Sequence, residues 1–330
     1  MDLIYTDVNY KDVGVMKDYA FDLAYGADEN DFELTIDLNN HCCEAGCLIY
    51  IEGTEYGGII DGLSVVSSED KLSYKGRSWQ GVLASKVVEP DDAGNPLVVS
   101  GDANTVIDEI IKDFGFDELF IASPDLSGLS IDNYAFDNYV DVYTGIIKML
   151  DTVSGKLKFS FTNNRVLVFA EPIVDYSKDE QFDNDKVEME IEKTRNTVNH
   201  LIFIGKPSKE DEESTLPVVH LYKNKDGIFN SDTKTFTGIQ EIMSVHEYSK
   251  EEDLQQLLDD LSKGDTKSLE SSLVEDKVQL NLTDEDNIYD VGDIIAAYEI
   301  VTGTYASQKI VKKIVTINQG EVNIQYKVGE

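Results

Sequence analysis

The chain has 330 residues, and its 64 acidic against 28 basic side chains give a formal net charge of −36 at pH 7. Hydrophobic residues make up 41%, with 17 tyrosines and 13 phenylalanines, which is typical of a folded, β-rich protein with two or three cores and argues against a disordered chain. No window reaches the roughly 18 apolar residues that span a bilayer, and the negative charge repels nucleic acid and anionic lipid. We therefore expect no membrane insertion and no sequence-specific nucleic-acid binding.

The negative charge has two interpretations that composition cannot separate. It is either the charge of a soluble protein from an acidic source, or the mark of a surface past which a nucleic acid must slide without binding. Residues 1–12 contain no basic segment followed by an apolar run, so we expect no secretory signal and folding in a cytoplasm.

Alternating apolar residues predict an N-terminal β domain over residues 1–75. The alternation is clearest at Phe32, Leu34 and Ile36, and glycine turns separate three short strands in residues 50–75. We expect residues 194–245 to complete this domain.

Residues 76–184 change to a mixed pattern that predicts a small α/β insert. Asp102 or Asn104 is expected to cap the first helix, and the Asn163–Asn164 dipeptide predicts a hairpin turn. The expected helices reach to about Phe114 and over residues 139–152, and the expected strands are 156–161 and 165–170.

The last part of the chain alternates between acidic loops and strands. We expect a linker or surface loop at 175–193, an acidic loop at 208–215 and a helix at 250–261 that Ser249 caps. The expected strands are 200–205, 218–223, 277–282, 294–300, 309–317 and 322–328. Residues 246–330 are thus predicted to be a helix plus a C-terminal β-barrel-like domain. The predicted fold class is α+β, mostly β, with two barrel-like β domains flanking the insert.

Three cysteines lie beside His41, at Cys42, Cys43 and Cys47. An odd number without a signal peptide argues against disulfides. Four potential metal ligands are present, but the CxxC spacing of structural zinc sites is missing and adjacent strand residues point to opposite faces. We expect reduced thiols, although the sequence alone leaves metal binding by the three cysteines open.

No other pattern predicts a catalytic, cofactor-binding or metal-binding residue. Ser78 misses the G-x-S-x-G pattern by one residue and is expected to be a cap. Arg77 and Arg195 are expected to form ion pairs, and the histidines are expected to be structural. The acidic pairs 183/185 and 284/286 do not continue as calcium loops, and no phosphate-binding glycine loop occurs.

A series of short motifs resembles a known family. The series comprises 53–60 (GTEYGGII), 76–81 (GRSWQG) with Leu83, 101–104 (GDAN), 198–202 (VNHLI) with Gly205, 221–222 (LY) ahead of 226–227 (DG), 291–295 (VGDII), and Gly320 ahead of 324–329 (IQYKVG). In this order and spacing, the chain resembles the siphophage tail hub (baseplate hub, tail-tip) proteins found in prophages of Gram-positive bacteria.

The resemblance implies a non-enzymatic structural protein, made in the bacterial host cytoplasm and carried at the tip of a virion tail. It implies a homotrimer whose two barrel-like domains per subunit build a pseudo-sixfold ring below the tail tube. The implied partners are a distal tail or tail-tube protein and tip or fibre proteins. No cofactor is implied, and because the chain stops at Glu330, any hydrolase or receptor-binding fibre is expected to be a separate chain.

Two other function classes compete with this interpretation. One is a hydrolase that acts through convergent carboxylates, which predicts a cleft with a raised carboxylate pKa. The other is an extracellular carbohydrate- or calcium-binding module, which needs an export signal that the sequence does not contain.

Overall fold

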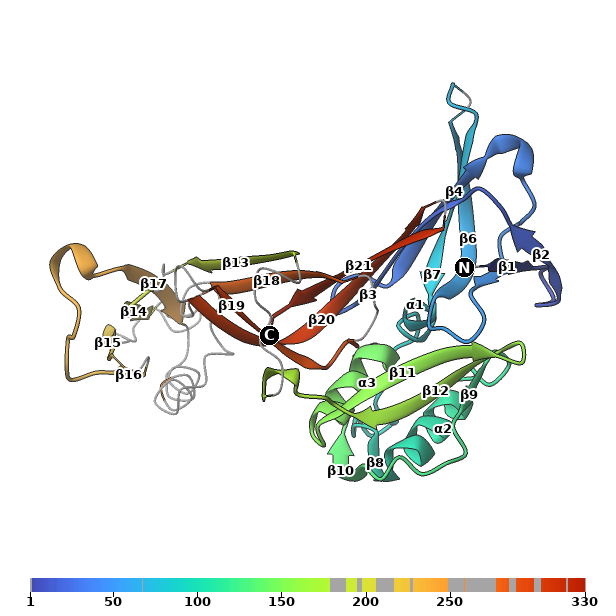
Figure 1. Cartoon of the computed structure of the whole chain (residues 1–330). Helices are drawn as coiled ribbons and strands as arrows, with labels where there is room; N and C mark the ends of the chain where they lie inside the picture. Colours follow the sequence, from blue (N-terminus) through green and yellow to red (C-terminus); the bar gives the residue numbers. More distant parts are fainter. Residues whose placement is uncertain are drawn as a thin grey trace. The chain divides into compact units, whose positions relative to one another are not determined.

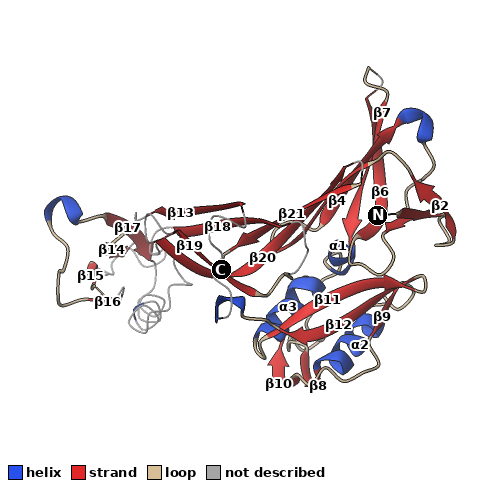
Figure 2. Cartoon of the chain, viewed as in Figure 1, coloured by secondary structure: helices blue, strands red, loops and turns tan. Residues whose placement is uncertain are grey.

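The computed structural model describes residues 2–66, 68–178, 188–194, 198–205, 217–225, 228–248, 258, 277–284, 289–299, 304–318 and 320–329. The chain divides into two compact units. The large unit comprises Met1–Ile191 with Gln279–Glu330, and the small unit comprises Glu192–Val278. Strands make up most of the described chain (Figure 2), which confirms the prediction of a mostly β protein.

The large unit is built on one long sheet that joins both ends of the chain. Its strand order is β13-β18-β21-β20-β3-β4-β7-β6-β5-β1-β2, and β19 pairs with β20. The strands are β1 (Leu3–Thr6), β2 (Asp12–Met16), β3 (Ala20–Gly26), β4 (Asp31–Asp37), β5 (Leu48–Tyr50), β6 (Gly57–Val66), β7 (Lys71–Ser78), β13 (Glu188–Thr194), β18 (Lys277–Asp284), β19 (Ile294–Glu299), β20 (Thr304–Asn318) and β21 (Glu321–Val328).

The junction between the two ends of the chain is the pairing of β3 with β20. The two strands run antiparallel from Gly26 opposite Lys312 to Ala20 opposite Asn318. Figure 1 shows the blue N-terminal β3 beside the red C-terminal β20. Among the described strands the order does not close on itself, because β13 and β2 are its two ends.

Alternation along β4 divides the sheet into an apolar and a polar face. Phe32, Leu34 and Ile36 are buried, whereas Asp31 and Glu33 between them are exposed. Because side chains of paired residues point to the same side of a sheet, the apolar face of β4 continues onto β3, β7, β20 and β21. The resulting core includes Phe21, Leu23, Leu72, Tyr74, Val315, Ile317, Ile324 and Tyr326.

Two glycines of the motif at 76–81 are required by close backbone approach. A Cβ atom on Gly76 would lie 2.0 Å from the carbonyl oxygen of Ile59, and one on Gly81 would lie 2.1 Å from that of Asn30. Ser78 between them is the N-cap of α1 (Trp79–Leu83), and its Oγ accepts a hydrogen bond from the Gly81 amide at 3.2 Å. The predicted capping role of Ser78 is confirmed.

The insert folds against the long sheet as two helices and two small sheets (Figure 1). Its elements after α1 are β8 (Val98–Asp102), α2 (Ala103–Asp113), β9 (Phe120–Ala122), β10 (Ser130–Ala135), α3 (Val142–Asp151), β11 (Gly155–Thr162) and β12 (Arg165–Pro172). Asp102 caps α2 by accepting from the Asn104 amide at 3.0 Å. Asn163 and Asn164 form the turn between β11 and β12 with positive φ. Both predicted helices and the predicted hairpin are confirmed.

Trp79 links the insert to the long sheet. Its side chain is fully buried, and its ring stacks on Phe161 of β11 at a centroid distance of 5.5 Å. Tyr50 of β5 stacks on the same phenylalanine at 3.8 Å. The tryptophan therefore belongs to a core that the two parts of the large unit share.

The small unit contains one sheet with the order β16-β15-β14-β17. Its strands are β14 (His200–Gly205), β15 (Val219–Lys223), β16 (Phe229–Asn230) and β17 (Met243–Tyr248). β14 pairs with β15 antiparallel and with β17 parallel. Its core consists of Val198, Leu201, Phe203, Leu221, Phe229 and Tyr248.

The structure differs from the expected organisation in two places. The N-terminal strands were expected to be completed by residues 194–245, but they pair with β20, and the small-unit sheet forms separately. Strand pairing between chain ends leaves no local sequence signal, which explains this difference. The linker prediction for 175–193 is wrong at β13, where residues 188–194 form a strand.

Several predictions lie outside the described residues. They are the acidic loop at 208–215, the helix at 250–261 apart from Leu258, Arg195, and the acidic pairs 183/185 and 284/286 apart from the backbone of Asp284.

Replacing Trp79 by alanine is expected to lower the free energy of unfolding by about 3–5 kcal/mol, because it leaves a cavity in the shared core. Urea titration followed by circular dichroism measures the change. Leu126→Ala is the matched control, because that leucine is 77% exposed. Equal unfolding midpoints for both variants would contradict the placement of Trp79 in the core.

Candidate functional site: an acidic sheet face and a buried ion-pair junction

The polar face of the long sheet carries a groove of about 710 Å³. Five carboxylates and two cations line it, on strands that are neighbours in the sheet. The lining residues are Asp22, Ala24, Glu29, Asp31, Phe32, Glu33, Asp61, Gly62, Lys75, Gly76, Arg77 and Ile314. We call this surface the acidic face.

The two cations of the acidic face are held in ion pairs. Arg77 donates to both carboxylate oxygens of Asp61, at 2.8 Å from Nε and 2.7 Å from Nη2. Lys75 lies 3.4 Å from the carboxylate of Glu33 on the adjacent strand. The prediction that Arg77 forms an ion pair is confirmed, and no cation in the lining is left over for Asp22.

Two carboxylates on this face ionise less readily than usual. Partial burial, together with the negative charges of Glu29, Glu33 and Asp31, raises the pKa of Asp22. Partial burial and Glu29 also raise the pKa of Asp31, against the opposing charges of Lys312 and Lys75. Both shifts follow from desolvation and like charges on neighbouring strands, so they do not by themselves require a catalytic role.

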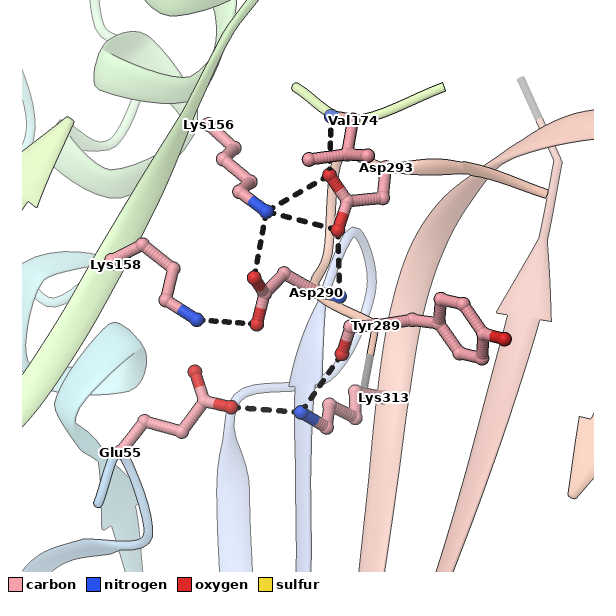
Figure 3. A network of polar contacts seen from close by, with 8 residues as sticks. All are labelled: Glu55, Lys156, Lys158, Val174, Tyr289, Asp290, Asp293 and Lys313. Carbon is pink, nitrogen blue, oxygen red and sulfur yellow. Dashed lines mark hydrogen bonds and ion pairs between the residues drawn. The ribbon is translucent and has the colours of Figure 1, made fainter. Parts of the chain in front are cut away.

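A cluster of buried ion pairs connects the insert with the C-terminal segment of the large unit (Figure 3). Lys156 of β11 donates to Asp290 at 2.7 Å and to both oxygens of Asp293 at 2.9 Å. Lys158 on the same strand donates to the other oxygen of Asp290 at 2.5 Å. The side chains of Lys156 and Asp293 are 4% and 0% exposed, so these charges depend on each other for solvation.

The carboxylate of Asp293 also binds two backbone amides. It accepts from Val174 at 2.8 Å and from Asp290 at 3.0 Å. One buried carboxylate thus fixes β11, the segment after β12 and the turn before β19.

A second buried lysine extends this cluster into the sheet. Lys313 of β20 donates to Glu55 at 2.9 Å and to the carbonyl oxygen of Tyr289 at 3.1 Å. Its ammonium lies 5.8 Å and 5.6 Å from the ring centres of Tyr56 and Tyr326, a cation–π arrangement. We call Lys156, Lys158, Asp290, Asp293, Lys313 and Glu55 together the ion-pair junction.

Electrostatics favour the charged forms of Lys156 and Asp290. Burial opposes the charge of Lys156, but its hydrogen bonds with Asp290 and Asp293 outweigh it and raise the lysine pKa. Burial likewise opposes ionisation of Asp290, but Lys158 and Lys156 outweigh it and lower the pKa of Asp290. The charges of Lys156 and Asp290 are thus stabilised by each other inside the protein.

Two residues of the ion-pair junction belong to sequence motifs, but the sequence did not predict that they form buried ion pairs. Glu55 belongs to the motif at 53–60 and Asp293 to the motif at 291–295. Gly292 in the second motif has a φ of +105°, and a Cβ there would lie 3.0 Å from Cβ of Lys156. Lys156, which joins the two aspartates, has no motif of its own, and 134 positions separate it from Asp290.

Two of the three cysteines lie in the core, and the thiols of Cys42 and Cys43 are 3.7 Å apart. Cys43 and Cys47 are buried and Cys42 is exposed. Burial and the neighbouring thiol of Cys42 raise the pKa of Cys43, which disfavours the thiolate that a metal would need. His41 makes a 2.8 Å hydrogen bond with the hydroxyl of Tyr74 instead. Within the described ranges, no three His, Cys, Asp or Glu residues are grouped to hold a metal ion.

Comparison with known proteins identifies the fold. No protein-family model matches the chain, and no curated protein matches it either. Among solved structures, the 43 kDa tail protein of prophage MuSo2 from Shewanella oneidensis is similar over 100% of this chain and 98% of its own, with 10% identity and a TM-score of 0.53. Prophage tail protein gp18 from Listeria monocytogenes EGD-e is similar over 99% and 94%, with 12% identity and a TM-score of 0.51.

These similarities extend over essentially the whole chain and establish the fold class at very low sequence identity. They do not distinguish one bacterial host from another, so the Gram-positive origin stays a prediction. Among the helices that the structure describes, none is long and apolar enough to cross a membrane.

Replacing Lys156 by methionine is expected to lower the free energy of unfolding by about 3–5 kcal/mol, because two buried carboxylates lose their shared cation. Lys112→Met is the control, since that exposed lysine pairs only with Asp108 one helical turn away. Differential scanning calorimetry compares the variants. A melting temperature for Lys156→Met as high as that of the control would show that the junction contributes nothing.

The pKa shifts in the junction predict how its contribution depends on pH. The lowered pKa of Asp290 means that its stabilisation is complete above the unfolded value of about 4 and is lost as pH falls through the lower folded value. The raised pKa of Lys156 means stabilisation below about 10.5 that is lost as pH rises further. Urea unfolding at several pH values measures the free energy of unfolding of the wild type and of Asp290→Asn. The difference between these two free energies should shrink as pH falls from 5 to 3. A difference that stays constant would refute the ion pairing.

Proposed function

We propose that the chain is a structural subunit of a phage or prophage tail, located in the baseplate or tail-tip hub that links the tail tube to the tip. The observation that carries this proposal is the fold, which is similar over nearly the whole chain to two prophage tail proteins. The motif series that resembles tail hub proteins supports the same assignment independently. The chain would be made in the host cytoplasm and carried at the virion tail tip.

The acidic face supports a specific place for the chain in such a hub. A hub lumen must pass DNA, and a surface with a net negative charge repels phosphate. Asp22, Asp31 and Glu33 lie on neighbouring strands of one polar sheet face. In the proposed homotrimeric ring, the acidic face lines the channel, and the open sheets of adjacent subunits together form the barrel-like wall.

The proposed position in the ring implies which proteins the chain contacts. A distal tail or tail-tube protein would contact one side of the ring, and tip or fibre proteins the other. The ion-pair junction suits this role, because buried and mutually neutralised charges hold the insert at a fixed position on the sheet while the ring bears load.

A hydrolase that acts through convergent carboxylates is the second candidate. It is favoured by one observation, the raised pKa values of Asp22 and Asp31 in a groove. Removal of the two carboxylates distinguishes the candidates, because a hydrolase loses its acid and base. A channel wall instead keeps three carboxylates against two cations and therefore has no net positive charge.

Genetic complementation tests both candidates. A prophage lacking the gene is expected to make no complete tails, and the wild-type gene should restore them. The double variant Asp22→Lys, Glu33→Lys should restore tails but lower DNA delivery by about tenfold or more. The reason is that a positively charged channel wall binds the passing phosphates. Asp22→Asn with Asp31→Asn should deliver DNA normally.

The matched control carries the same charge change on the insert, as Asp113→Lys with Glu118→Lys, two exposed positions outside the groove. Normal infectious particles without the gene would contradict the tail role. Equal DNA delivery by the two lysine variants would contradict the channel position. Loss of infection with the asparagine variant, despite normal tails, would favour the hydrolase.

A further inference from the structure

The small unit contains a continuous chain of polar contacts between four ionisable side chains. Lys234 lies 2.6 Å from Oε1 of Glu241, and the same oxygen lies 2.6 Å from Nδ1 of His200. On the other side of the imidazole, Nε2 of His200 lies 2.8 Å from Nδ1 of His220. The side chain of His200 is 5% exposed, whereas His220 lies on the surface.

Hydrogen-bond geometry restricts where the protons are. The pKa of Glu241 is lowered by its hydrogen bonds with Lys234 and His200, so it is a carboxylate and accepts the proton on Nδ1 of His200. The contact between the two imidazoles then needs one N–H and one lone pair. Neutral His200 accepts from His220, or cationic His200 donates to neutral His220.

The two histidines can therefore take one extra proton without losing their contact. A second extra proton places an N–H on both facing nitrogens at 2.8 Å, with two positive charges side by side. That arrangement has no acceptor, so the contact must open. Coupled sites of this kind bind their protons in two separate steps.

Several aromatic and ionisable side chains lie on the strands next to His200. The ring of Tyr222 on β15 packs against His200 at a centroid distance of 4.6 Å. The other ionisable side chains on the adjoining strands are Lys223 on β15 and His246 and Glu247 on β17. His246 lies on the opposite face, because it pairs with Phe203, and it bonds with Ser244. Glu247 pairs with Ile204 and so lies on the same face as His200, whose hydrogen-bonded carboxylate is that of Glu241.

The segment ahead of β17 is held by the start of β14 rather than by the His220 contact. The backbone amides of Asn199 and His200 both donate to the carbonyl oxygen of Ile242, at 3.0 and 3.1 Å. The Asn199 side chain also bonds with Gln240 and Ile242. These bonds and the Glu241 contact attach the segment ahead of β17 to the start of β14.

We propose that the His200–His220 contact is an acid-sensitive switch in the small unit. It stays closed while the two histidines share at most one extra proton, and it opens when both are protonated. Opening releases the exposed His220 ring and weakens the β14–β15 pairing that places it opposite Ile202, whereas the Glu241 contact with a cationic His200 is retained.

Hydrogen exchange of the full-length chain between pH 7 and 4.5 tests the switch, after correction for the intrinsic pH dependence of exchange. Protection of the Lys223 amide, which donates to the carbonyl oxygen of Asn199 between β15 and β14, is expected to fall by up to about tenfold per pH unit in the wild type, as one linked proton allows. In His220→Gln the fall should be absent, because the amide offers both a donor and an acceptor to His200. His246→Gln, on the other face, should behave as the wild type.

Imidazole carbon NMR on the same proteins provides a second measurement that does not depend on stability. His220 should titrate in two steps in the wild type and in one step in His200→Gln. A single wild-type step that His200→Gln leaves unchanged would overturn the proposal. So would equal exchange of the wild type and His220→Gln at every pH, with amides of the large unit as the folding control.

Discussion

Lys156 is an ammonium group almost completely removed from water, and it is tolerable only because Asp290 and Asp293 contact it directly. These two aspartates come from the C-terminal segment, whereas the lysine comes from the insert. The requirement to neutralise a buried charge therefore fixes how the insert lies on the sheet. Lys313 applies the same requirement to Glu55 in the N-terminal half, so three parts of the large unit meet at one electrostatic contact.

The long sheet divides the chemistry of the large unit between its two faces. One face supplies the core, and the acidic face stays polar because Asp22, Asp31 and Glu33 alternate with buried residues along their strands. This arrangement gives a surface with five carboxylates and two ion-paired cations in its lining. The proposed channel wall for DNA would need such a negatively charged surface.

Local features were predictable from the sequence where a short-range rule decides them. Ser78 and Asp102 cap helices, and Asn163–Asn164 turns a hairpin, because caps and turns depend on neighbouring residues. The pairing of β3 with β20 was not predictable, since about 290 positions of chain lie between them and alternation marks a strand without naming its partner. Two of the six residues of the ion-pair junction, Glu55 and Asp293, lie in motifs. Lys156 was not predictable, because a lysine on a strand is normally solvated.

The central claim is that this chain is part of a tail tip. Immunogold labelling of tail particles induced from the strain that carries the gene, with an antibody against the purified chain, tests it most directly. The account predicts label confined to the tip of intact or mildly disrupted tails. Tails that stay unlabelled after disruption, with the chain recovered only from the soluble cell fraction, would contradict it.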